Sequence, residues 1–198
     1  MRDAAMQEQD SFAETPELHE RIDRVGYALL GGATVMFFLG FVFAYFYLRS
    51  LDTNELWRPA GVSPPTGYGI AIAASLALSA FAFGYAARVA KRGDGGWVRL
   101  TGVALALGLF ACVAQMVEYA HIPFGPQSGG YASVFFGWTA LYVVATLLSL
   151  YRLETVFALG VRHRDHPEKM PEGFAPSAYY WALLAGIGIL AWIVLYLV

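Results

Sequence analysis

Long uncharged stretches alternate with short polar connectors along the chain. A helix needs about 20 residues to cross the ~30 Å hydrocarbon layer of a membrane. Trimmed for turn-forming residues, the stretches predict membrane-spanning helices at about residues 26–48, 68–88, 99–120, 131–153 and 176–198. Their apolar runs are continuous, whereas a membrane-spanning strand alternates over ~10 residues. The pattern therefore predicts an all-α integral membrane protein, a bundle of five transmembrane helices.

The connectors carry the residues that end helices. Glycine and proline interrupt the first three connectors, at Pro59, Gly61, Pro64, Pro65 and Gly67, then at Gly93, Gly95 and Gly96, then at Pro123, Gly125, Pro126, Gly129 and Gly130. The fourth connector, about residues 154–175, is the longest and the most polar. None could form a second domain, so we expect one transmembrane domain over residues 25–198.

Residues 1–24 form an acidic tail without the apolar core of a signal peptide. Thr15 followed by Pro16 is typical of a helix start. Apolar residues then recur at helical spacing, at Leu18, Ile22 and Val25. We expect a short interfacial helix that runs into the first span, with a disordered solubilising tail as the alternative for residues 1–14.

Composition supports a lipid environment. Charged residues make up 14% of the chain, where a soluble domain carries roughly 25%. Apolar residues make up 58%, and this excess needs a solvent other than water. The only cysteine, Cys112, excludes a disulfide scaffold, and a net charge of −2 gives no reason to expect nucleic-acid binding.

The positions of the basic residues predict the orientation in the membrane. With the N-terminus inside, 11 of the 13 basic residues fall on the cytoplasmic side: Arg2, Arg21, Arg24, Arg88, Lys91, Arg92, Arg99, Arg152, Arg162, Arg164 and Lys169. The outer connectors hold only Arg49 and Arg58. Cytoplasmic loops carry the excess of Lys and Arg, so we expect a cytoplasmic N-terminus and Val198 on the outer side.

The centre of every predicted span is free of Asp, Glu, Lys, Arg and His. The histidines fall in the tail, in connectors or at span ends, at His19, His121, His163 and His166. Haem or copper bound in a membrane is usually held by histidines from span interiors, so we expect no metal, cofactor or catalytic site in this chain. The same absence argues against a proton pump or an ion-coupled transporter.

Glu118 is the exception, about one turn from the outer end of the third span. Together with His121 it forms Glu-x-x-His, which is half of a di-iron site in ferritin-like bundles. No second motif of this kind is present, so we expect no metal here. The alternative is an interfacial carboxylate paired with His121, a tyrosine or a backbone donor across helices.

Small residues at helical spacing predict close approach of helices. They occur at Ala178, Ala182 and Gly186, and at Gly102 and Ala106. Helices in lipid associate through such positions, either inside one bundle or against a partner protein. The first span also carries many aromatic residues between Phe37 and Tyr47, which we expect to face lipid or to fill packing gaps.

The order of five motifs resembles subunit III of haem-copper (cytochrome c) oxidases. The sequence VMFFLGFVFAY at residues 35–45 is similar to the aromatic helix that in this family begins with Ser-Glu, and a tryptophan- and proline-rich loop follows at residues 57–65. QMVEY at residues 115–119 is similar to the family's Gln-x-x-Glu-Tyr, and GYASVFF at residues 130–136 to its Tyr-Gly-Ser-x-Phe-Phe. AYYW at residues 178–181 resembles the start of its final helix. The resemblance covers about residues 27–198.

The chain departs from the family pattern at polar positions inside the membrane. The family's carboxylate in the first matching helix falls at Thr34, two histidines fall at Thr139 and Tyr142, and a His and an Asp fall at Ala182 and Ala185. Glu118 is the polar signature that persists. The family also occurs with seven helices, and five helices resemble its short bacterial form.

The resemblance implies an accessory, non-catalytic subunit of a respiratory terminal oxidase in the bacterial plasma membrane. Such a subunit would pack against catalytic subunit I and subunit II, which hold the haem and copper, and would bind phospholipid. Glu118, Tyr119 and His121 are then the expected polar anchors toward a lipid or another subunit. Two alternatives stay open: an accessory protein associated with nitric oxide reductase, and a stand-alone channel or transporter.

Overall fold

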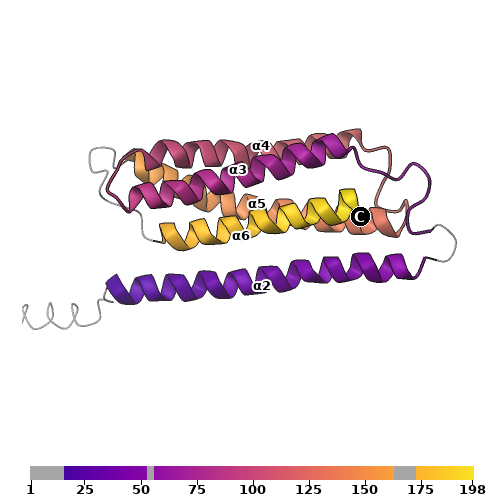
Figure 1. Cartoon of the computed structure of the whole chain (residues 1–198), viewed down its shortest axis with the longest axis horizontal. Coiled ribbons are helices and arrows are strands. Elements are labelled where there is room, and N and C mark those ends of the chain that lie inside the picture. The colour runs from indigo at the N-terminus through magenta and orange to yellow at the C-terminus, as the bar shows by residue number, and fades with distance from the viewer. Residues whose placement is uncertain (1–15, 53–55, 163–172) are drawn as a thin grey trace, which may run out of the picture.

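The computed structural model describes residues 16–52, 56–162 and 173–198, and every regular element within these ranges is helical. The elements are α2 (Pro16–Ser50), α3 (Thr66–Ala90), α4 (Trp97–His121), α5 (Gly130–Arg162) and α6 (Phe174–Trp192), and α6 is followed directly by a π-helical turn, η1 (Ile193–Leu197). The helices lie side by side in one elongated bundle, with the start of α2 at one end and Val198 toward the other (Figure 1).

Five helices of the described chain are long and apolar enough to cross a membrane. The candidate spans are Arg21–Ser50, Thr66–Ala90, Trp97–His121, Gly130–Arg162 and Phe174–Leu197. The prediction of an all-α protein with five membrane-length helices is therefore confirmed. The side of the membrane on which each end of the bundle lies stays a prediction.

Two helices are longer than predicted. α2 begins at Pro16 and runs without a break to Ser50, so the expected interfacial segment and the first span form one helix. Thr15 and the rest of the acidic tail lie outside the described residues. α5 continues to Arg162 instead of ending near residue 153. The prediction ended this helix where charged residues begin, but intrahelical hydrogen bonds form in water as well, so a helix can continue beyond its apolar stretch.

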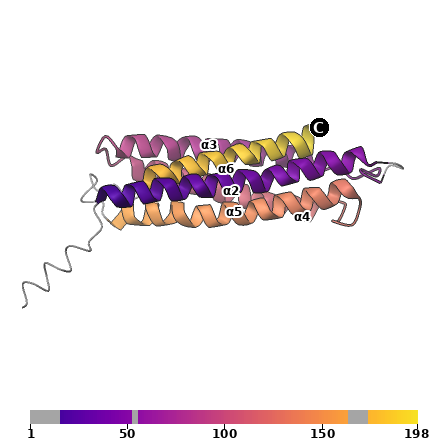
Figure 2. The same ribbon diagram turned by 90° about the horizontal axis from the view of Figure 1, so that it is seen from below.

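The peripheral helix of the bundle is α2. α3 packs against both α4 and α6, α4 packs against α5, and α2 contacts mainly α5 and α6. Seen from below, α2 crosses in front of α5 and α6 (Figure 2). Only 17% of the residues in the most apolar part of α2 are buried, against 39–44% in the other four helices. Most of the apolar surface of α2 therefore faces away from the rest of the chain.

Close helix contacts depend on two glycines in the inner helices. A Cβ atom on Gly108 of α4 would lie 3.1 Å from the Trp181 ring, and one on Gly188 of α6 would meet the Tyr142 hydroxyl. Of the small ridge predicted on α6, Ala178 is buried inside the chain, whereas Ala182 and Gly186 are exposed. Helices in lipid associate through close packing and hydrogen bonds, so the buried glycines set the spacing of the bundle.

The loop after α2 covers one end of the bundle. The first N–H groups of a helix have no partner within it. Here the Gly130 and Tyr131 N–H groups of α5 donate to the carbonyls of Leu56 and Trp57, at 3.3 and 2.8 Å. The Arg58 guanidinium lies 4.3 Å from the centre of the Tyr131 ring, a favourable cation–π distance. The loop is thereby fixed against the start of α5.

Candidate functional site

Glu118 lies in the last turn of α4 and is completely buried. Its helix turns a row of small and polar residues inward at intervals of three or four: Gly108, Ala111, Gln115 and Glu118. The small residues allow the neighbouring helices to approach, and the two polar ones follow toward the end of the bundle. This periodicity places a carboxyl group among α4, α5 and the end of α6.

Two side chains donate hydrogen bonds to the Glu118 carboxylate. The Tyr196 hydroxyl lies 2.7 Å from Oε1 and 2.8 Å from Oε2. Gln115 Nε2, one turn earlier on α4, lies 2.7 Å from Oε2. The carboxylate therefore ties the end of the last helix to α4.

Tyr196 belongs to the π-helical turn η1. In this turn the Val198 N–H donates to the Ile193 carbonyl at 3.2 Å, five residues back. The Tyr131 hydroxyl of α5 donates to the Leu195 carbonyl at 2.6 Å, which satisfies an acceptor near the end of the helix. Isolated π-helical turns are rare and occur frequently at functional sites.

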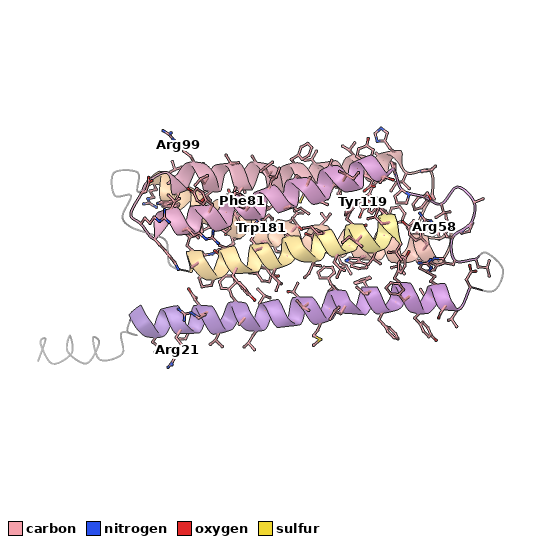
Figure 3. The ribbon with its side chains drawn as sticks, viewed as in Figure 1. Arg21, Arg58, Phe81, Arg99, Tyr119 and Trp181 are labelled. Atoms are coloured by element: carbon pink, nitrogen blue, oxygen red, sulfur yellow. The ribbon has the colours of Figure 1, made fainter. Side chains whose placement is uncertain are left out.

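Tyr119 joins α4 to α5 beside this carboxylate. Its hydroxyl donates to Thr139 Oγ1 at 2.6 Å, and the Thr139 hydroxyl donates onward to the Phe135 carbonyl at 2.6 Å. Tyr119 lies toward the same end of the bundle as Arg58 (Figure 3). The sequence predicts Tyr119 as a polar anchor. It does not predict that Gln115, Thr139 and Tyr196 belong to the same cluster.

His121 lies apart from this cluster. Its ring is exposed, with Nδ1 2.7 Å from the Val117 carbonyl oxygen, and it stacks on Tyr68 of α3 with ring centres 6.0 Å apart. His121 follows Glu118 by three residues, and three residues along a helix rotate the side-chain direction by about 60°. Within the described ranges, no group of three or more His, Cys, Asp or Glu residues could hold a metal ion.

Hydroxyl groups occupy three positions at which the sequence departs from the resembled family pattern. Thr34 Oγ1 lies 3.1 Å from the Tyr180 hydroxyl, between α2 and α6. Thr139 accepts from Tyr119, and Tyr142 donates to the Leu184 carbonyl at 2.8 Å. Each contact joins two helices without a side chain that is charged at neutral pH. Neutral hydrogen bonds at these positions hold the bundle together without the cost of a buried charge.

A second feature is an open cavity of about 270 Å³ between α2, α5 and α6. Its lining is mostly apolar, with polar groups from tyrosine, serine and arginine: Tyr27, Leu30, Ala145, Leu148, Ser149, Arg152, Leu153, Ser177, Tyr180 and Trp181. A neighbouring hollow of about 460 Å³ shares Tyr27 and is lined also by Arg24 and Lys91. These spaces could not be predicted from the sequence, because segments far apart in the chain line each of them.

Comparison with known proteins identifies relatives along almost the whole chain. The family model for cytochrome c oxidase subunit III matches residues 2–198. Cytochrome c oxidase subunit 3 of Cyprinus carpio is 24% identical over 188 residues, covering 92% of this chain and 71% of the relative. The Sus scrofa subunit 3 is 26% identical over 185 residues, covering 87% and 68%. Since the family model extends over nearly every residue of the five-helix bundle, the chain belongs to the cytochrome c oxidase subunit III family.

Proposed function

We propose that this chain is the accessory, non-catalytic subunit III of a respiratory haem-copper terminal oxidase in a bacterial plasma membrane. The observation that carries the proposal is the family match over residues 2–198. The chain is a multi-pass membrane protein of that family, and its span centres carry no Asp, Glu, Lys, Arg or His that could move protons or ligate a redox metal. Its contribution to aerobic electron transport would then be the support of neighbouring subunits.

The expected partners are the catalytic subunit I and subunit II of the oxidase. Haem and copper would be held by those subunits, and the electron donor, cytochrome c or quinol, would bind there as well. The helix that offers most apolar surface is α2, where Met36 is 73% exposed and Phe43 is 69% exposed. Such a surface faces either lipid or a neighbouring transmembrane helix.

We further propose that part of a phospholipid lies in the open cavity between α2, α5 and α6. Leu30, Leu148 and Leu153 supply apolar surface for an acyl chain. Arg152 lines the same cavity, and Arg24 and Lys91 line the adjoining hollow. Arginine and lysine recognise phosphate groups through charge-assisted hydrogen bonds. The arrangement of apolar surface beside cations supports a role in holding lipid at the margin of α2.

The basic end of the bundle is proposed to face the cytoplasm. Arg21 and Arg99 lie at one end and Arg58 at the other (Figure 3). Eight of the ten basic residues in the described ranges belong to segments at the first end: Arg21, Arg24, Arg88, Lys91, Arg92, Arg99, Arg152 and Arg162. The excess of Lys and Arg in cytoplasmic segments supports this orientation.

Purification of the tagged chain from its native membrane in mild detergent tests the proposed function. We expect haem-bearing subunits to co-purify, with a haem spectrum and oxygen-reducing activity. A tagged chain that remains colourless and without partners would overturn the proposal. Co-purified nitric oxide reductase activity in place of oxygen reduction would favour the alternative accessory role.

A further inference from the structure

A small cavity lies beside the Glu118 cluster, where α3, α4, α5, α6 and η1 meet. Its volume is about 30 Å³. The residues that line it come from all five elements and include Ala73 of α3, Gln115 of α4, Thr139 of α5, Trp192 of α6 and Tyr196 of η1. A water molecule needs about 10–15 Å³ of such volume, so the cavity has room for at least one water molecule.

Two polar groups on the lining residues lack a partner within the described chain. The Trp192 indole N–H is buried and donates no hydrogen bond. Gln115 gives its amide N–H to Glu118, and its carbonyl oxygen accepts no hydrogen bond from the described residues. The orientation of the Gln115 amide follows from the Glu118 carboxylate, which accepts a hydrogen bond from an N–H group and repels a carbonyl oxygen. One donor and one acceptor therefore remain unpaired.

A water molecule can satisfy both groups at once. It accepts a hydrogen bond from an indole N–H and donates one to an amide oxygen. The Tyr196 and Thr139 hydroxyls, which also line the cavity, offer further oxygen atoms. Buried waters typically make two to four hydrogen bonds to otherwise unsatisfied polar groups, whereas cavities that stay dry are apolar. Most of this lining is apolar, but it includes two residues that carry an unpaired polar group, Trp192 and Gln115.

We propose that this cavity holds one bound water molecule that bridges the Trp192 indole N–H and the Gln115 carbonyl oxygen. The water gives the Glu118 cluster a second connection from α4 to α6, parallel to the direct contact of Tyr196. It is independent of the lipid cavity and of the proposed place of the chain in an oxidase.

A structure of the protein with its native partners or in a lipid nanodisc, at a resolution that shows ordered water, tests the proposal. We expect one peak within about 2.7–3.2 Å of both Trp192 Nε1 and Gln115 Oε1. An empty cavity would overturn the proposal. Xenon bound there under pressure would overturn it as well, because xenon enters dry apolar cavities.

Two matched pairs of variants sharpen the test. Ala73→Val places a larger side chain in the cavity and fills part of it, while Ala74→Val adds the same side-chain volume at an exposed position of α3. We expect the water peak to be lost in Ala73→Val and retained in Ala74→Val, and its persistence in Ala73→Val would contradict the proposal.

If Ala73→Val does not fold, the variants Trp192→Phe and Trp138→Phe are compared. Both indoles are buried and without a partner, but Trp138 does not line this cavity. Trp192→Phe is expected to lower the melting temperature more, and the reverse order would contradict the proposal.

Discussion

Tyr196 and Glu118 are 78 residues apart in the sequence, yet the tyrosine hydroxyl lies within 2.8 Å of both carboxylate oxygens. One side chain belongs to the last turn of α4 and the other to the π-helical turn at the end of α6. An ionisable group at membrane depth costs at least a few kcal/mol unless it finds partners. The contact offsets that cost and at the same time fixes the end of the last helix.

Tyr196→Phe should destabilise the protein by about 1–3 kcal/mol, because it leaves a buried carboxylate with fewer donors. The aromatic ring and its contact with Phe135 are kept, so the loss reports on the hydroxyl. Unfolding of the purified protein in detergent, followed by circular dichroism, measures the change. The control is Tyr179→Phe on α6, whose side chain is 63% exposed. Equal stabilities of the two variants would contradict the role given to the Tyr196 hydroxyl.

Glu118→Gln should cost less stability than Glu118→Leu. The glutamine amide oxygen still accepts from Tyr196, whereas leucine leaves the Tyr196 hydroxyl and the Gln115 amide without their partner. Each buried polar group left unsatisfied costs about 1–3 kcal/mol. Thermal unfolding of both variants under the same conditions measures the difference. If the leucine variant were as stable as the glutamine variant, loss of the carboxylate would not destabilise the protein through the unpaired Tyr196 and Gln115 donors.

Gly108→Ala should destabilise the bundle by about 1–3 kcal/mol, which is the usual cost of overpacking a core. The added methyl would press on Trp181 of α6 and Leu150 of α5. Gly84→Ala on α3 is the matched control, because nothing lies within 4 Å of a Cβ atom there. Alanine is the better helix former, so this control should be neutral or slightly stabilising. Similar losses in both variants would mean that helix spacing does not depend on Gly108.

The spans were predictable because hydrophobicity and length alone decide whether a helix can cross a membrane. The end of α5 was not, because Arg152 and Glu154 mark the end of an apolar stretch and not the end of a helix. Features that depend on the local sequence could therefore be predicted, whereas features that depend on the surroundings of a helix could not.

The buried cluster shows the same division. The sequence singles out Glu118 as the one carboxylate within a predicted span, and it allows a tyrosine among the partners. It contained no signal that the partner would be Tyr196, because the choice depends on how α6 packs against α4. His121 was placed beside Glu118 by spacing alone, and the structure turns its ring outward instead. The small cavity formed by five elements could not be read from any one segment.

Ala145→Phe should reduce the amount of phospholipid that co-purifies with the protein. Ala145 lines the cavity between α2, α5 and α6, and a phenyl ring there would occupy space proposed for an acyl chain. Ala140→Phe, at an exposed position of α5, is the control. Phosphorus analysis and lipid mass spectrometry of the delipidated and native samples measure the ratio. We expect about one lipid fewer per protein in Ala145→Phe only, and an unchanged ratio would argue against a lipid in this cavity.

Reporter fusions test the orientation of the bundle. Alkaline phosphatase is active only outside the cytoplasm, so a fusion after Val198 should be active and a fusion in the turn at Gly95 should be inactive. The physical reason is the distribution of basic residues, since Lys91, Arg92 and Arg99 flank that turn. A cytoplasm-active reporter at the same two positions serves as the complementary control and should give the opposite result. Activity in the reverse order would place the basic end of the bundle outside. Equal activity at both positions would contradict an arrangement in which three helices, α4, α5 and α6, separate the two sites.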